Sequence, residues 1–188
     1  MKKLLAVVDM QNDFITGALP NTEGQKIVPI LAEYIKNYDG EVIATRDTHN
    51  ENYMNTQEGQ KLPIPHCIEN TEGWRLVPEI QEALDARPQK NRYRIFDKPT
   101  FGCVDLGKTI AVEKYDVIEL CGVCTDICVI SNAMLLRAFA PETEIQVIAD
   151  LCAGVTPETH NEALLAMGNC QIVITNTVEL AVRRDHGL

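Results

Sequence analysis

The sequence lacks an excess of positive charge. Its 188 residues include 17 Lys and Arg against 27 Asp and Glu, so the formal net charge is −10. Proteins that bind nucleic acids or anionic membranes use basic side chains to neutralise phosphates. We therefore expect neither a nucleic acid nor a membrane as a partner.

Long apolar runs are also absent, since no stretch reaches the roughly 18 residues of a transmembrane helix. The opening MKKLLAVVDMQNDF is similar to a signal peptide, but Asp9 interrupts its apolar part and no small-residue cleavage site follows. Seven cysteines is an odd number, and several lie in apolar segments. This pattern favours reduced thiols over a secreted disulfide framework, and it predicts a cytoplasmic protein.

Short apolar segments alternate with longer segments of helical periodicity. Strands are predicted at residues 4–8, 42–45, 94–96, 117–120, 145–149 and 172–174. Helices are predicted at residues 24–38, 76–84, 106–113, 126–139, 157–167 and 177–184. Continuous apolar strands are typical of parallel sheets covered on both faces. We predict a single α/β domain over residues 1–188, with a doubly wound, Rossmann-like, mostly parallel six-stranded sheet and helices on both faces.

Reactive side chains follow four of the predicted strands. Asp9 follows the first, Asp47 to His49 the second, Asp97 and Lys98 the third, and a cysteine cluster the fourth. Ligands bind outside the carboxyl ends of the strands in sheets of this kind. The irregular stretch 47–73 is long enough to indicate a functional loop. The sequence therefore predicts a site at this edge of the sheet.

The cysteine cluster CGVCTDIC, residues 121–128, allows three interpretations. A closed metal site is disfavoured because it needs four ligands and the cluster offers three. Small buried residues are the usual fate of free cysteines, and we expect it for Cys121 and for four others: Cys67, Cys103, Cys152 and Cys170. Cys128 differs because, with Thr125 as N-cap, it falls in a first helical turn, which lowers a thiol pKa. The backbone N–H groups of Cys124 and Cys128 could then form an oxyanion hole.

A nucleophilic thiolate needs a proton acceptor and a nearby cation. Asp9 and Lys98 lie at neighbouring strand ends and suit these roles. Their alternatives are a helix-capping acid and a solvated lysine. His160 and His186 lie late in the chain, and we expect them away from the reactive strand ends.

Three motifs together identify a family: VVDMQNDF (7–14), FDKPTFG (96–102) and CGVCTDICV (121–129). The sequence resembles the isochorismatase-like cysteine hydrolases, and TRDTH (45–49) with PHC (65–67) points to the nicotinamidase, or pyrazinamidase, branch. The resemblance spans residue 5 to about residue 150. It implies a catalytic triad of Asp9, Lys98 and Cys128, an oxyanion hole from the backbone of Cys124 and Cys128, and a cis peptide between Val123 and Cys124.

Asp47, His49 and His66 form a second constellation. Their nitrogen and oxygen ligands suit zinc, manganese or iron, although a chance grouping is the alternative. The resemblance implies one divalent metal ion here, with zinc as the first choice and Glu58 as a fourth ligand. Other members use a histidine closer to Asn55.

The resemblance also implies substrate contacts from Gln11, Phe14, Phe101 and Val123. Nicotinamidases often carry a tryptophan before Pro-x-His, where this chain has Leu62 or Pro63. The aromatic wall of the pocket is therefore expected to be thin. Trp74 is expected to pack after the loop rather than to replace that wall.

The resemblance predicts a metal-containing amidohydrolase that converts the small molecule nicotinamide to nicotinate and ammonia through a thioester. It also implies a homo-oligomer. A second hypothesis is another cysteine hydrolase of this family, acting on a carbamoyl or ureido amide. A third is a non-catalytic thiol redox or binding module.

Overall fold

The computed structural model describes residues 1–88 and 93–180. One six-stranded sheet has the strand order β3-β2-β1-β4-β5-β6, and every neighbouring pair is parallel. The strands are β1 (Lys3–Val8), β2 (Glu41–Asp47), β3 (Arg94–Lys98), β4 (Val117–Val123), β5 (Glu144–Ala153) and β6 (Val173–Thr175). The predicted doubly wound α/β fold is confirmed. The chain runs outward from β1 through β2 to β3, then returns to place β4 on the other side of β1 and continues outward to β6.

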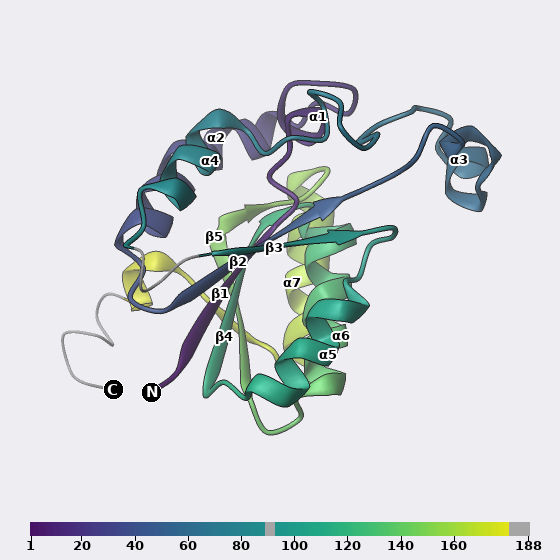
Figure 1. Cartoon of the computed structure of the whole chain (residues 1–188). Helices are drawn as coiled ribbons and strands as arrows, with labels where there is room; N and C mark the ends of the chain where they lie inside the picture. The colour runs from purple at the N-terminus through teal and green to yellow at the C-terminus, as the bar shows by residue number, and fades with distance from the viewer. Residues whose placement is uncertain (89–92, 181–188) are drawn as a thin grey trace.

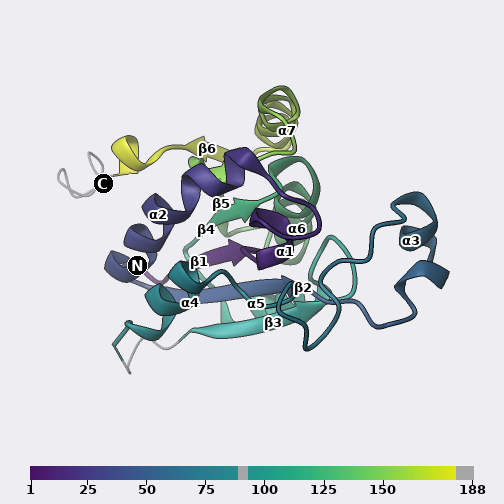
Figure 2. The same ribbon diagram turned by 90° about the horizontal axis from the view of Figure 1, so that it is seen from above.

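Helices cover both faces of this sheet (Figures 1 and 2). On one face lie α2 (Thr22–Asn37) and α4 (Pro78–Asp85), and on the other α5 (Val104–Glu113), α6 (Ile130–Phe139) and α7 (Pro157–Asn169). Shorter elements lie in the loops at the carboxyl edge: α1 (Asn12–Ile15), η1 (Tyr53–Asn55), α3 (Gln57–Lys61) and the π-helical η3 (Thr125–Val129). The predicted helix at 126–139 is therefore η3 followed by α6. Of the predicted helix at 177–184, residues 177–180 are helical and the rest lies outside the described residues.

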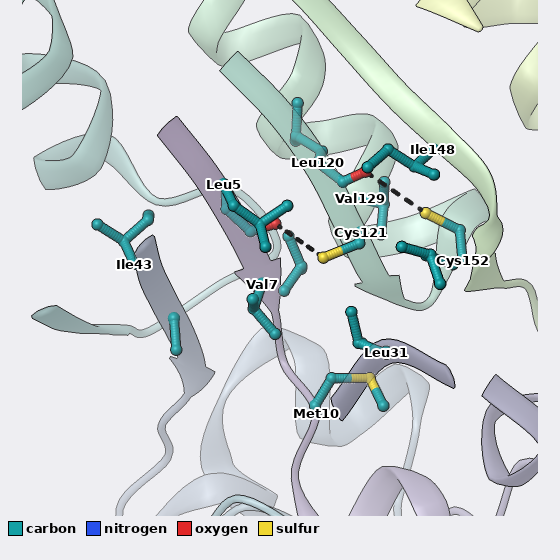
Figure 3. Packing of buried hydrophobic residues seen from close by; sticks show 14 of the residues in the cluster. Leu5, Val7, Met10, Leu31, Ile43, Leu120, Cys121, Val129, Ile148 and Cys152 are labelled. Carbon is teal, nitrogen blue, oxygen red and sulfur yellow. Dashed lines mark hydrogen bonds between the residues drawn. The ribbon is translucent and has the colours of Figure 1, made fainter. Parts of the chain in front are cut away.

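The core explains why the strands are apolar at nearly every position. Leu5 and Val7 of β1 and Cys121 of β4 are fully buried, and Leu31 of α2 packs on the same side (Figure 3). Burying one such side chain stabilises the fold by about 1.5–3 kcal/mol. The Cys121 thiol lies 3.6 Å from the Ala6 carbonyl oxygen, so it is a packing residue as expected.

Four of the five cysteines expected to be buried are buried: Cys67, Cys103, Cys121 and Cys152. The expectation was wrong for Cys170, which is exposed. Cys170 follows the last turn of α7, where the chain turns towards β6 at the surface.

The carboxyl ends of β1 and β4 meet at a tight backbone contact. Gly122 has a φ of 113°, and a Cβ atom there would lie 2.1 Å from the Val8 carbonyl oxygen. Only glycine fits such a close approach. Directly after β1, Asp9 adopts a left-handed φ of 49° and its N–H donates to the Thr45 carbonyl. The chain thereby turns Asp9 towards the segment that follows β4.

No helix within residues 1–88 and 93–180 has the length and apolar character needed to cross a membrane.

Candidate active site

Asp9, Lys98 and Cys128 come together at the carboxyl edge of the sheet. The Lys98 ammonium lies 2.6 Å from Asp9 Oδ2 and 3.5 Å from Cys128 Sγ. Asp9 follows β1, Cys128 lies in the turn after β4, and Lys98 ends β3, two strands away from β1. A lysine suits that position because its long side chain reaches across the end of β2. All three side chains are buried.

Thr45 is a member of this group that sequence reasoning missed. Its hydroxyl donates a 2.6 Å hydrogen bond to Asp9 Oδ1, so Asp9 accepts from Thr45 with one oxygen and pairs with Lys98 through the other. Thr45 lies inside the TRDTH motif, but it belongs to the buried strand β2 and reads there as an ordinary strand residue. Its role is to orient the carboxylate.

The thiol pKa differs from the expectation drawn from the helix position. Burial raises the pKa of Cys128 well above its usual value, and the Asp9 carboxylate raises it further, while Lys98 lowers it. The predicted lowering was therefore wrong, because burial and carboxylates from distant strands outweigh the local turn. The predicted cap was also one residue late: Cys124, in extended conformation, is the N-cap and Thr125 is already helical.

The pKa values of the two charged partners show where a proton can go. Burial raises the pKa of Asp9 above its usual value despite the opposing effect of Lys98. Burial alone would lower the pKa of Lys98, but Asp9, Cys128 and Asp47 raise it overall. Lys98 therefore stays charged, and Asp9 is the group with increased affinity for the proton of the neighbouring thiol.

The Val123–Cys124 peptide bond is cis, as the resemblance implied. Cys124 and Cys128 both line the same cavity. The oxyanion hole predicted from their backbone N–H groups remains a prediction.

Asp47, His49, Glu58 and His66 form a second cluster, in which one ligand atom from each residue lies within 4.8 Å of every other. His49 Nε2 is 2.9 Å from Asp47 Oδ2 and 3.7 Å from Glu58 Oε1. His66 Nε2 is 3.5 Å and 3.9 Å from the same two atoms. Asp47 ends β2, Glu58 lies on α3, and the other two lie in the connecting loop.

The loop is shaped to bring the two histidines together. The His49 N–H donates to the Cys67 carbonyl, and a bridge pairs His49 with Ile68, so the two arms of the loop run side by side. The Tyr53 ring packs against both imidazoles, with centroid distances of 4.7 Å and 5.0 Å. His66 Nδ1 lies 2.8 Å from the Ile64 carbonyl oxygen. Because that oxygen can only accept, Nδ1 carries the hydrogen and Nε2 offers a lone pair to the cluster.

These residues fit a divalent metal ion. Ligands of tetrahedral zinc lie about 2.0–2.2 Å from the ion, which puts them roughly 3.3–3.6 Å from one another. The separations of 3.5 Å, 3.7 Å and 3.9 Å are close to this range, and the 2.9 Å contact between His49 and Asp47 is shorter. Burial alone would raise the pKa of Asp47, but the two neighbouring histidines and the Lys98 ammonium hold it well below its usual value. A buried carboxylate that stays ionised beside two imidazoles is a suitable donor set for zinc, manganese or iron.

Asp47 joins the two clusters. Its Oδ1 lies 3.3 Å from the Lys98 ammonium, while its Oδ2 faces the two histidines. Gln11 holds this residue in place: it accepts from the Asp47 N–H at 2.7 Å and donates to the Asp47 carbonyl at 2.8 Å. A third Gln11 hydrogen bond runs from its amide nitrogen to the Trp74 carbonyl. Asp47 is thus fixed through both its backbone and its side chain.

A cavity of about 470 Å³ lies between the two clusters. Cys128 lines it together with the metal-site residues Asp47, Glu58 and His66, and Phe14 and Phe101 supply aromatic rings. The substrate contacts expected of Gln11 and Val123 remain a prediction, and neither residue is among those that line the cavity. The Gln11 side chain is hydrogen-bonded to the backbone of Asp47, and Val123 is fully buried in the sheet.

The positions weighed for the aromatic wall behave differently. Of Leu62 and Pro63, which precede the Pro-x-His segment, Leu62 lines the cavity. Trp74 packs elsewhere, as expected: its Nε1 donates to the Thr48 hydroxyl and the Arg46 guanidinium lies 3.6 Å from its ring centroid. The wall on the Leu62 side is therefore aliphatic.

His160 corrects another expectation, since it does not lie away from the reactive strand ends; the same expectation for His186 lies outside the described residues. Its Nδ1 is 2.8 Å from the Thr125 hydroxyl, at the start of the turn that carries Cys128. Burial lowers the pKa of His160, which favours the neutral ring. Asn21 was missed altogether: it caps α2, donates to the Gly154 carbonyl and lines the cavity. The sequence marks Asn21 as a helix cap, but nothing local shows what else it contacts.

Comparisons with known proteins agree with this geometry. A family model described as the isochorismatase domain matches residues 3–179. An uncharacterized isochorismatase family protein of Bacillus subtilis, PncA, is 30% identical over 179 residues, covering 90% of this chain and 96% of the relative. The nicotinamidase of Saccharomyces cerevisiae is 25% identical over 184 residues, covering 76% and 85%.

Solved structures are similar over almost the whole chain. The pyrazinamidase of Pyrococcus horikoshii in complex with zinc has 30% identity and a TM-score of 0.76, covering 94% of this chain and 99% of that one. The nicotinamidase/pyrazinamidase PncA from Bacillus subtilis has 25% identity and a TM-score of 0.78, covering 94% and 100%. The resemblance read from the motifs is confirmed: this chain belongs to the isochorismatase family.

Proposed function

We propose that this protein is a metal-containing nicotinamidase, which hydrolyses nicotinamide to nicotinate and ammonia through a thioester on Cys128. The chain is an amidohydrolase, as its family and its nicotinamidase relatives indicate. One observation carries the narrower assignment. Cys128 and three of the four metal ligands, Asp47, Glu58 and His66, line one cavity, and Asp47 also joins the metal cluster to Lys98, the partner of the thiol.

The first half of the reaction forms the thioester. Cys128 Sγ attacks the carboxamide carbon while its proton passes to Asp9, whose pKa is raised by burial. The backbone N–H groups of Cys124 and Cys128 stabilise the negative charge on the carboxamide oxygen. Asp9 then returns the proton to the nitrogen, the carbon–nitrogen bond breaks, and ammonia leaves.

The second half regenerates the thiol. Asp9 removes a proton from water, which attacks the thioester carbon. The carbon–sulfur bond breaks, the proton returns to Sγ, and nicotinate leaves. Lys98 remains charged throughout, because the neighbouring carboxylates raise its pKa against the effect of burial, and it stabilises the negative sulfur.

Asp47, His49, Glu58 and His66 would hold the metal ion, for which we propose zinc, with manganese and iron as alternatives. When bound, the ion supplies a Lewis-acidic anchor for the pyridine nitrogen. Phe14 stands beside this cluster, with its ring centroid 5.5 Å from that of His66, and provides an apolar surface for the substrate ring.

The remaining parts of the proposal concern the setting of the enzyme. All seven cysteines lie in the described parts of the chain and are free thiols, which supports a reducing compartment such as the cytoplasm. We propose that residues 1–188 form one catalytic domain that assembles into a homo-oligomer and takes a small amide as substrate.

The direct test is the release of ammonia from nicotinamide by the purified protein. We expect activity that falls on treatment with a chelator and returns when zinc is added back. Benzamide, which has no ring nitrogen, is the matched control and should be a poor substrate. A protein that holds no metal, cannot be reloaded and treats both amides alike would contradict the nicotinamidase assignment, and would favour the hydrolysis of a carbamoyl or ureido amide instead.

A further inference from the structure

We infer that the preferred substrates are nicotinamide-type amides that carry an apolar substituent at ring carbon 5. The substituent would lie on an apolar rim formed by Leu62, Ile64, Phe101, Ile127 and Val155 at the cavity. This inference rests on the proposed function and concerns the substrate class of the same site.

The cavity is larger than nicotinamide requires. At the roughly 30 Å³ that one water molecule occupies in the liquid, the non-hydrogen atoms of nicotinamide would take up at most about 270 Å³. The cavity holds about 470 Å³. A substantial part of it is therefore open to another group.

The rim shows which chemistry that group should have. Large apolar side chains line the cavity while remaining exposed: Leu62 by 36%, Ile64 by 40%, Phe101 by 43% and Val155 by 56%. They come from three separate segments, which follow α3, β3 and β5. Apolar side chains gathered around a cavity indicate a ligand contact. An aliphatic or aromatic substituent matches these side chains, whereas a charged one does not.

The backbone of each rim segment is held by a hydrogen bond from a side chain elsewhere. The Tyr53 hydroxyl donates to the Leu62 carbonyl at 2.9 Å. Asn132 Nδ2 donates to the Phe101 carbonyl at 3.0 Å, and Asp126 Oδ1 accepts from the Val155 N–H at 3.1 Å.

Ile64 is held in the same way, since its carbonyl accepts from the His66 ring at 2.8 Å. The rim is thus formed before any ligand arrives. A preformed apolar surface binds a substituent without a large ordering cost.

The geometry of the ring selects the position of the substituent. In the proposed binding mode the carboxamide on ring carbon 3 faces Cys128, and ring nitrogen 1 faces the cluster of Asp47, Glu58 and His66. Ring carbon 5 lies diametrically opposite the carbon between these two anchored positions. A substituent there points away from both clusters and towards the rest of the cavity. A substituent on carbon 2 points between them, towards the charged side chain of Asp47, which joins the two clusters.

The test compares nicotinamide with 5-butylnicotinamide and with its isomer 2-butylnicotinamide. A fully buried methylene contributes about a fourfold gain in affinity, so a half-buried butyl chain should raise kcat/KM on the order of tenfold. The 2-butyl isomer has the same atoms and hydrophobicity, and should be a poorer substrate than nicotinamide. Dissociation constants for the Cys128→Ala variant, measured by calorimetry, should follow the same order without any chemical step.

Substitutions locate the effect on the rim. Val155→Ser and Ile64→Ser should each lower the preference for 5-butylnicotinamide over nicotinamide several-fold. The same type of change at Val112, an exposed residue of α5 that does not line the cavity, should leave both the preference and the activity unchanged.

The outcomes separate this inference from the proposed function. If nicotinamide is hydrolysed but 5-butylnicotinamide is not preferred, the substrate inference is overturned and the nicotinamidase assignment stands. If the metal-loaded protein hydrolyses neither, both fall. If the preference is absent and Val155→Asp dissociates an oligomer, the rim is covered by a second copy of the chain, which also overturns the inference.

Discussion

Strand β3 has a cation at each end, and the two cations lie in different environments. At the amino end, Arg94 makes a two-pronged ion pair with Glu113, with both contacts at 2.7 Å and side chains 40% and 32% exposed. At the carboxyl end, Lys98 lies 2.6 Å from Asp9, and both side chains are 0% exposed. One strand therefore carries an exposed pair and a fully buried one.

The exposed pair is of the kind that adds a little stability, whereas the buried pair is explained by the chemistry of the site. A partly exposed ion pair contributes about 0.2–1 kcal/mol. A buried pair loses the hydration of both ions, and replacing it by well-packed apolar residues is often neutral or stabilising. Packing alone therefore gives no reason for Lys98 and Asp9 to be buried. Their position 3.5 Å from the Cys128 sulfur does give one, because a desolvated charge acts strongly on a neighbouring thiol.

The largest expected effect is at the nucleophile. Cys128→Ala should lower the hydrolysis of nicotinamide by at least about 10⁴-fold, because no other group can form the thioester. The variant should keep its metal, since Cys128 belongs to the other cluster. Cys121→Ala is the control: that thiol is buried against the Ala6 carbonyl, and the variant should retain substantial activity. Ammonia release and metal content measure the two properties, and full activity in Cys128→Ala would remove Cys128 from the mechanism.

A smaller loss should follow when the cation at the carboxyl end of β3 is removed. Lys98→Met should reduce activity by roughly 10²–10³-fold, since it removes the charge that stabilises the thiolate. Because Lys98 lowers the pKa of Cys128, the variant should need a higher pH for alkylation of that thiol by iodoacetamide.

The matched control is the cation at the other end of the same strand. Arg94→Met should leave both the activity and the alkylation profile unchanged, because Arg94 contacts Glu113 and Tyr115 far from the thiol. An alkylation profile that is the same in Lys98→Met and in the unmodified protein would exclude Lys98 from the site.

Loss of the metal cluster should have a more moderate effect. His49→Ala removes one of four ligands and should lower kcat/KM for nicotinamide by at least about tenfold, together with the metal content. The kcat/KM for benzamide should fall less, so the difference in kcat/KM between the two substrates should narrow. Alkylation of Cys128 should persist, because the Asp9–Lys98 pair remains. If metal-free His49→Ala kept the same ratio of kcat/KM for nicotinamide to kcat/KM for benzamide, the metal would have no part in substrate selection.

The parts of the fold and site that could be predicted are those set by local pattern. Buried parallel strands such as β1 have apolar residues at successive positions, so their place is visible in the sequence. Asp9, Lys98 and Asp47 could be singled out because they directly follow or end such strands. Parallel strands bring those ends to one edge, which makes the edge predictable without any contact being known.

The parts that could not be predicted depend on contacts between distant segments. Thr45 meets Asp9 from 36 residues away, and His160 meets Thr125 from 35 residues away. Gln11 lies in a motif, but only the folded structure shows that it binds the backbone of Asp47. The pKa of Cys128 follows the same rule: the helical turn is local, whereas the burial and the carboxylates that raise the pKa come from other strands.

The smallest expected effect lies at the amino end of β3, and it depends on pH. The Arg94 guanidinium, with help from the Tyr115 hydroxyl, lowers the pKa of Glu113 from 4.5 to about 2. The folded state therefore holds the ionised form more strongly than the unfolded state does. The resulting stability is present above pH 4.5 and is lost as the pH falls towards 2.

Glu113→Gln should thus lower the free energy of unfolding by about 0.2–1 kcal/mol at pH 7, the range for a partly exposed pair. The deficit should shrink as the pH falls below 4.5, for as long as the protein stays folded. Urea unfolding at several pH values measures it, and Glu142→Gln, in an exposed turn, serves as the control. Catalytic activity should not change, since Glu113 lies at the opposite edge of the sheet from Cys128. A deficit that is independent of pH would mean that Glu113 acts through packing, and a loss of activity would mean that the two ends of β3 are coupled.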